Sequence, residues 1–138
     1  MVDGSTEATD FVQTESNRDR VHSFICDVLI PNQLDQLGDY LDENYIEHNP
    51  PVGDGLATLH TALSDSAANG GITIRYDKLH RVLAEGNFVL AVSEGLLNGQ
   101  PAAFYDLFRV TEGKLVEHWD TTEVIPPRSE WKNDNGKF

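Results

Sequence analysis

The sequence predicts a single α+β domain in which helices come first and a curved antiparallel sheet follows. In the first half of the chain, apolar residues recur at spacings of three and four, which is typical of amphipathic helices. After Gly71 the chain changes to four runs of strand-like composition, separated by short segments rich in Gly and Asn. A length of 138 residues suits one domain with one hydrophobic core.

Three helices are expected before the sheet. The first spans residues 17–30, where apolar side chains share one face, Asn17 is a suitable N-cap and Pro31 ends the helix. A second, shorter helix is expected at about 32–38, and a third is marked by Leu56, Leu59 and Leu63. The stretch between the second and third helices contains Asn-Pro-Pro and several glycines, so a loop is predicted there.

Four strands are expected after Gly71, at residues 72–83, 88–97, 102–110 and 114–125. Their short connections make each strand antiparallel to the next.

The turn before the last strand sets the register. A three-residue turn at 111–113 places Asp106 opposite His118 and Phe104 opposite Asp120. This turn is favoured because it brings the polar side chains of both strands onto one face. A two-residue turn places Asp106 opposite Trp119 instead.

These polar side chains lie in rows that are otherwise apolar. Asp106 alternates with Phe104 and Phe108, and His118 and Asp120 share a face of the last strand. We expect the sheet to curl around an apolar cavity into which this face points. Burial raises the pKa of a carboxyl group, and a second titratable group nearby separates the two titrations. The pattern therefore predicts acid–base chemistry, in which one group removes a proton and another donates one.

The expected site residues fall into two groups. Asp120 is the expected general base, with Asp106, His118 and His80 as catalytic partners, since His80 falls on the more apolar face of its strand. The residues expected to orient or line the bound molecule are Tyr45, His48, Asn49, Phe104, Phe108 and Trp119. The expected ligand is a small apolar carbonyl compound. Neither a cofactor nor a metal is expected, because the spacing of the His and Asp residues matches no metal signature.

Three alternatives stay open. Asp106 and His118 could form a buried ion pair that only fixes the strand register. The domain could bind a ligand or dimerise without catalysis, since a fold does not determine a function. The third alternative, epoxide hydrolysis, would favour an Arg between two Asp residues; Arg75 or Arg81 would have to serve, because Arg109 has the wrong parity.

The composition argues against several partners. A net charge of −13 disfavours binding to nucleic acid or to an anionic membrane. No apolar run reaches the roughly 20 residues that a membrane-spanning helix needs. Residues 1–16 are acidic and polar, unlike a signal peptide, and a flexible tail is expected there, followed by one domain at 17–138. The single cysteine, Cys26, is compatible with the reducing cytoplasm, which is the expected location.

Several stretches resemble the SnoaL-like polyketide cyclase group of the nuclear transport factor 2-like superfamily. They are YIEHNP at 45–50, FYDLFRVTEGKLVEHWD at 104–120, and the terminal IPP and NDNGKF. The superfamily also contains ketosteroid isomerase and limonene epoxide hydrolase. The resemblance implies a cone-shaped, cystatin-like α+β fold with three N-terminal helices against the curved sheet.

The same resemblance implies an activity and a partner. The activity is aldol-type ring closure of a polyketide-like ester, with Asp120 as the general acid and base; the cyclases have a histidine at the position that holds Asp106 here. The implied partner is a second copy, paired through the sheet to form a homodimer. Apolar residues on faces opposite the expected pocket favour such pairing, namely Leu79, Leu83, Tyr105 and Leu107.

Overall fold

The computed structural model describes residues 1–65 and 71–138. Helix α1 (Thr14–Phe24) follows a short 3₁₀ turn (Phe11–Gln13) and continues into a π-helical turn (Ile25–Leu29). It begins three residues before the predicted N-cap. Asn17 lies inside the helix, where its buried side-chain amide donates a hydrogen bond to the carbonyl of Gly86.

The second half of the helical layer is shorter and holds an unpredicted strand. A 3₁₀ turn (Leu34–Gln36) leads into helix α2 (Leu37–Tyr40), and helix α3 spans Leu56–Ser64. Between them lies strand β1 (Leu41–Glu47), in the stretch predicted to be a loop. Only Leu41 and Tyr45 of this strand are buried, so its sequence lacks the alternation that marks a strand.

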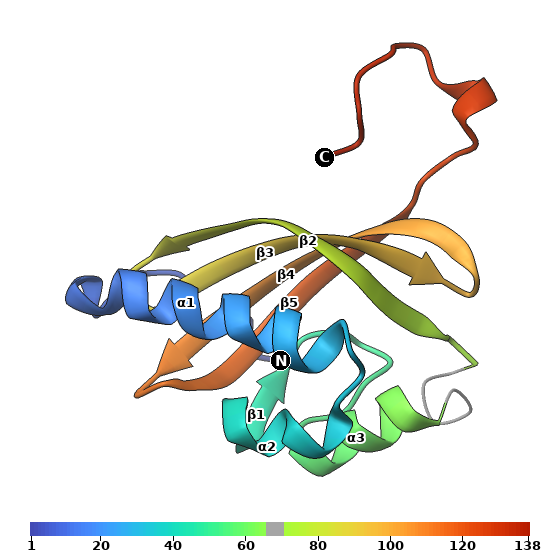
Figure 1. Ribbon diagram of the computed structural model, residues 1–138. Coiled ribbons are helices and arrows are strands. Elements are labelled where there is room, and N and C mark those ends of the chain that lie inside the picture. Colours follow the sequence, from blue (N-terminus) through green and yellow to red (C-terminus); the bar gives the residue numbers. More distant parts are fainter. Residues whose placement is uncertain (66–70) are drawn as a thin grey trace.

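The sheet contains five strands in the order β1-β5-β4-β3-β2. Strands β2 (Ile74–Glu85), β3 (Phe88–Leu97), β4 (Gln100–Thr111) and β5 (Lys114–Val124) correspond to the four predicted strands and pair antiparallel. Strand β1 pairs with β5 in parallel, which makes the sheet mixed instead of purely antiparallel. The predicted α+β class, with helices packed against a curved sheet, is confirmed (Figure 1).

The β4–β5 turn differs from the predicted three-residue turn. Thr111 pairs directly with Lys114, and the two turn residues, Glu112 and Gly113, both adopt the left-handed conformation, with φ of 50° and 76°. This conformation is that of the two-residue turns common in hairpins.

A β-bulge then corrects the register. Val110 pairs with Leu115, whereas Arg109 pairs with Glu117, so Val116 is the extra residue on β5. As a result His118 lies opposite Phe108, and Asp120 lies opposite Asp106. The predicted pairs are therefore wrong, while the predicted common face for the polar residues of β4 and β5 is correct.

The helices cover one face of the sheet and enclose the core (Figure 1). Helix α1 lies across the sheet, and α2 and α3 pack beside β1. Buried residues from the helices, from β1 and from the long strands meet there: Val21, Phe24, Ile25, Val28, Leu37, Leu41, Tyr45, Val89, Ala91, Phe108, Val110 and Leu115. We call the helix-covered face of the sheet the inner face and the opposite one the outer face.

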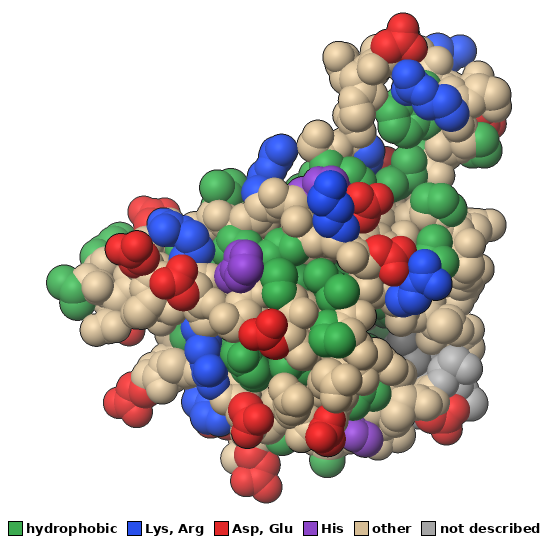
Figure 2. Space-filling view, in the orientation of Figure 1, with side chains coloured by type: hydrophobic (Ala, Val, Ile, Leu, Met, Phe, Trp, Pro, Cys, Tyr) green, Lys and Arg blue, Asp and Glu red, His purple; other side chains and the backbone are tan. Residues whose placement is uncertain are grey.

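The C-terminal segment lies beyond the last strand. The segment after β5 leaves the sheet and includes a short 3₁₀ turn (Arg128–Glu130) before the C-terminus (Figure 1). Acidic side chains are dispersed over the visible surface and form no single patch on it (Figure 2). Within the described ranges, no helix has both the length and the apolar character needed to cross a membrane.

Candidate active site

A pocket lies between the inner face of the sheet and the helices. Its empty volume is about 380 Å³, including the part open to solvent. Its apolar wall consists of Phe24, Leu29, Leu41, Leu59, Leu63 and Phe108. Its polar end consists of Tyr45, Glu47, Tyr76, Asp106 and His118. An apolar pocket with a few convergent polar groups is the usual form of a small-molecule site.

His118 is the centre of the polar end. Its Nε2 lies 2.8 Å from Asp106 Oδ1, and its Nδ1 lies 2.9 Å from Glu47 Oε1. Burial disfavours the charged ring, but the hydrogen bonds and charges of Asp106 and Glu47 outweigh burial and raise the pKa of His118 to about 10. At neutral pH His118 is therefore an imidazolium ion with both N–H groups donating to carboxylates.

The two carboxylates that bind His118, those of Asp106 and Glu47, accept further hydrogen bonds. Asp106 is 2% exposed, and its Oδ2 accepts a hydrogen bond of 2.8 Å from the Tyr76 hydroxyl. Glu47 accepts hydrogen bonds from the Tyr45 hydroxyl at 3.1 Å and from the Asn49 backbone N–H at 3.0 Å. Buried charges that are paired and hydrogen-bonded in this way form a rigid network.

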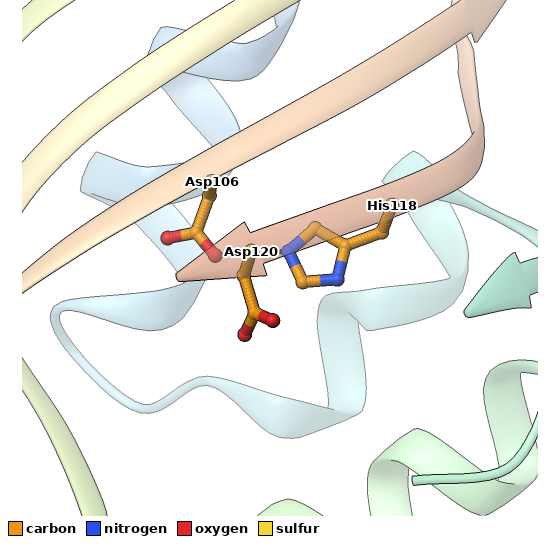
Figure 3. A group of neighbouring side chains, drawn as sticks. All are labelled: Asp106, His118 and Asp120. Atoms are coloured by element: carbon orange, nitrogen blue, oxygen red, sulfur yellow. Dashed lines mark hydrogen bonds and ion pairs between the residues drawn. The ribbon is translucent and has the colours of Figure 1, made fainter. Parts of the chain in front are cut away.

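Asp120 lies beside this network (Figure 3). One ligand atom each of Asp106, His118 and Asp120 lie within 4.8 Å of one another. The Asn49 side-chain amide donates to Asp120 Oδ2 at 3.1 Å, and no other described residue bonds to this carboxylate. Burial raises the pKa of Asp120 above its ordinary value and, of the neighbouring groups, the His118 charge lowers it while the Asp106 charge raises it further.

The site has the properties of a proton-holding network. Asp106, His118 and Asp120 are residue types that also bind metal ions. A metal ion could bind His118 only by displacing one of the protons that the ring donates to Asp106 and Glu47. The chemistry that this arrangement supports directly is proton transfer at Asp120 next to a fixed positive charge.

The structure brings together most of the residues that the sequence predicted. Asp106 is hydrogen-bonded to His118 and Asn49 to Asp120, and ligand atoms of Asp106, His118 and Asp120 lie within 4.8 Å of one another on the inner face. Tyr45 and Phe108 line the pocket, and Phe104 packs behind it with its ring 4.7 Å from the ring of Tyr76.

Three predicted site residues lie elsewhere. His48 and Trp119 stack on each other with ring centroids 4.7 Å apart, on the outer face. His80 binds Glu94 at 2.7 Å and stacks on Phe138, because two irregularities in the pairing of β2 with β3 break the simple alternation from which its inner position was predicted. None of the three lines the pocket.

Two site residues were missed by sequence reasoning. Glu47 was overlooked because the segment that holds it was predicted to be a loop, although its spacing of two from Tyr45 would place both on one face of a strand. Tyr76 has the correct parity in its strand but was not distinguished from other aromatic residues. The available signal is parity, since Glu47 is two residues from the buried Tyr45 and Tyr76 is two residues from the half-buried Ile74.

No arginine lies at the site among the described residues. Arg75 pairs with Asp77 and is 64% exposed, and Arg109 pairs with Glu117 on the outer face. Arg81 is exposed on β2. The arrangement of an Arg between two Asp residues, which the epoxide-hydrolysis alternative favours, is therefore not formed by these three residues.

The fold is that of nuclear transport factor 2-like proteins, a class of cone-shaped α+β domains. A structure described as NTF-2 like, of unknown function, from Burkholderia xenovorans superposes with a TM-score of 0.66 and 21% identity, covering 90% of this chain and 99% of that one. A candidate ketosteroid isomerase from Kribbella flavida gives a TM-score of 0.68 at 16% identity, with coverages of 91% and 94%.

A candidate polyketide cyclase from Acidithiobacillus ferrooxidans also shares the fold. Its TM-score is 0.58 at 12% identity, and the match covers 78% of this chain and 87% of that one. No family model matches the chain, and neither does any curated protein.

Proposed function

We propose that the protein is a cofactor-independent enzyme that transfers protons on a small, uncharged carbonyl compound, as in aldol-type ring closure or double-bond isomerisation. The observation that carries the proposal is the contrast between Asp120 and its neighbours. Asp106 and Glu47 are fully engaged by His118 and tyrosines, whereas Asp120 keeps one carboxylate oxygen without a described partner. Its raised pKa suits a group that takes up and returns a proton.

The proposed roles follow from the contacts. Asp120 removes a proton from the carbon next to the carbonyl and later returns it. His118 stays protonated and favours the negative charge that develops on the substrate oxygen, acting through its charge since both N–H groups are engaged. Asp106 and Glu47 fix the position and charge of His118, and the apolar wall excludes water.

The charge balance of the site restricts the substrate. Three carboxylates, from Glu47, Asp106 and Asp120, surround a single imidazolium ion. An additional negative charge placed at the polar end would be repelled at short range in a medium of low dielectric constant. The site therefore favours neutral molecules over carboxylates of the same size and shape.

An isotope-exchange experiment tests this function with model ketones in place of the natural substrate. A panel of small cyclic and aromatic ketones is incubated with protein in D₂O, and exchange of the protons next to the carbonyl is followed by NMR. The wild type should accelerate exchange for some members, and Asp120→Asn should remove the acceleration. Asp77→Asn, which changes an aspartate outside the site, is the matched control. Equal exchange in the wild type and in Asp120→Asn would overturn the proposal.

A non-catalytic binding module is the second candidate function. One observation favours it: Tyr45, Tyr76 and His118, the side-chain donors of the polar end, are each already paired with a carboxylate. No free donor among them is ready for a substrate oxygen. This alternative predicts that a ketone binds in the pocket and that no member of the panel exchanges protons faster with the protein than without it.

A further inference from the structure

Glu47 and Asn49 contact the two central groups of the site, His118 and Asp120, on the inner face of the sheet. Glu47 bonds to His118 at 2.9 Å, and Asn49 bonds to Asp120 at 3.1 Å. Both contacts join the end of β1 and the segment just after it to β5. The backbone continues the pairing, since the His48 N–H donates to the His118 carbonyl at 2.9 Å. Two of the three consecutive residues therefore place polar groups directly against His118 and Asp120.

The residue between them makes the corresponding contacts on the outer face. His48 Nε2 lies 2.8 Å from Glu117 Oε1, and the His48 ring stacks on Trp119 with an angle of 1° between the planes. Glu117 is 3% exposed and also accepts a hydrogen bond of 2.7 Å from Arg109. Alternation at the end of β1 explains why Glu47 points in and His48 points out, and the chain then bends at Asn49, whose side chain contacts Asp120 on the inner face.

We propose that His48 and Glu117 are positioning residues, whose contact on the outer face fixes residues 47–49 against β5 and so keeps Glu47 and Asn49 in place beside His118 and Asp120. Neither residue touches the pocket, and neither is a catalytic residue. The proposal uses the proposed function only in treating His118 and Asp120 as the working groups. The physical reason is that Glu47 and Asn49 would lose their hydrogen bonds to His118 and Asp120 if the backbone of residues 47–49 rotated.

The chain offers a close control for this pair. His80 and Glu94 form a second His–Glu contact away from the pocket, at 2.7 Å, and the side chain of His80 is 18% exposed, the same as that of His48. The residues beside His80, however, do not bond to the site. Removing the His80 ring should cost packing and one hydrogen bond without moving any site residue.

The experiment measures the pKa of His118 by NMR titration of its ring protons in the wild type, His48→Ala and His80→Ala. The titratable groups that face His118 are Asp106, Glu47 and Asp120, with the hydroxyls of Tyr45 and Tyr76 behind them. A carboxylate that moves away from a histidine lowers the pKa of that histidine, by roughly one pH unit for a single close contact. We expect such a fall in His48→Ala and no change in His80→Ala.

The outcomes are separable from those of the proton-exchange experiment. A His118 pKa in His48→Ala equal to that of the wild type, even with a lower melting temperature, would overturn the positioning role and leave a purely structural one. Glu117 keeps Arg109 as a partner in this variant, so no buried charge is left alone. Should His48→Ala fail to fold, Glu117→Gln preserves size and shape and should lower the His118 pKa in the same direction. This titration needs no substrate, so its result stands whether or not the protein is an enzyme.

Discussion

Asp106 and Asp120 lie directly opposite each other on β4 and β5, yet only Asp106 has both carboxylate oxygens engaged by side-chain partners. The difference arises from the elements that lie beside each residue. His118 and Tyr76 both form hydrogen bonds with Asp106. Asp120 lies beyond the last β1–β5 pair, which is Glu47 with His118, and among the described residues it accepts a hydrogen bond from Asn49 alone. Two carboxylates of the same type thus differ in their environments, which is the arrangement that assigns different roles to paired acids.

The first prediction concerns the stability of Asp120→Asn. Because burial raises the folded-state pKa of Asp120, the folded protein keeps this proton longer than the unfolded chain as the pH rises. The stabilisation is complete below the ordinary pKa and is lost as the pH rises through the folded value. At neutral pH the Asn variant should therefore be as stable as the wild type or more stable, as measured by thermal unfolding from pH 4 to 8.

The control for this prediction is Asp77→Asn, in which the aspartate lies outside the site and contacts Arg75. A clear loss of stability of Asp120→Asn at pH 7, larger than that of the control, would show that Asp120 is a structural ion-pair partner of His118. The acid–base role would then lose its main support.

The second prediction concerns His118→Gln. The folded pKa of His118 is about 10, above its ordinary value of 6.5, so its contribution is complete below about pH 6.5 and declines as the pH rises toward 10. Removing the imidazolium leaves Asp106 and Glu47 buried without their cation, which costs about 3–5 kcal/mol in comparable buried pairs. Denaturant unfolding at pH 6 and pH 9 should show a large loss at pH 6 that shrinks at pH 9.

His60→Gln serves as the control, because His60 is exposed on α3 and outside the network. If His118→Gln and His60→Gln changed stability equally at both pH values, His118 would not be the charged centre of the site.

Part of the fold and part of the site could be predicted from the sequence. The hairpins from β2 to β5 were predicted well because their turns and alternation are local signals. Strand β1 was not, because its partner β5 is about 70 residues away and only that pairing makes a polar stretch extended. Glu47 lies on this strand and was therefore not predicted, although it is one of the two carboxylates that bind His118.

Local irregularities account for the remaining errors. The bulge at Val116 has no distinctive residue, yet it restores the face that a two-residue turn would otherwise have reversed. Interruptions in the β2–β3 pairing likewise moved His80 away from the pocket and turned Leu79 toward the core. Alternation predicts faces reliably only between bulges.

The third prediction concerns Tyr76→Phe. The variant removes the hydroxyl that donates to Asp106 at 2.8 Å and leaves a buried carboxylate oxygen without a partner. A hydrogen bond to a charged group contributes about 1.5–3 kcal/mol, and the free energy of unfolding should fall by that amount. Tyr105→Phe, on the outer face with Tyr105 37% exposed, should change it by less than about 0.5 kcal/mol. Equal effects in the two variants would contradict the network described for Asp106.

The fourth prediction concerns the charge of the ligand. Cyclohexanone and cyclohexanecarboxylate share a ring that suits the apolar wall but differ by one negative charge at the polar end. Repulsion from the carboxylates of the site should make the carboxylate bind at least about tenfold more weakly at pH 7, which corresponds to about 1.4 kcal/mol. NMR titration of the pocket residues measures both affinities. Tighter binding of the carboxylate would show that the polar end carries less negative charge than its contacts indicate.

The fifth prediction concerns assembly, for which we propose a homodimer formed through the outer face. Leu83, Leu90, Leu107 and Trp119 form a cross-strand row there, and Leu83 is 59% exposed. An exposed apolar side chain at the end of such a row favours contact with a second sheet. Sedimentation should show a dimer for the wild type at micromolar concentration and a monomer for Leu83→Glu.

The matched variant is Val12→Glu, which adds the same charge at an apolar residue that is 93% exposed in the 3₁₀ turn before α1. This variant should remain a dimer, because Val12 lies outside the apolar row of the sheet. A monomeric wild type at micromolar concentration would remove the proposed dimer. Dissociation of both variants would show that the added negative charge, and not the loss of an apolar contact at Leu83, separates the subunits. The net charge of −13 already opposes association.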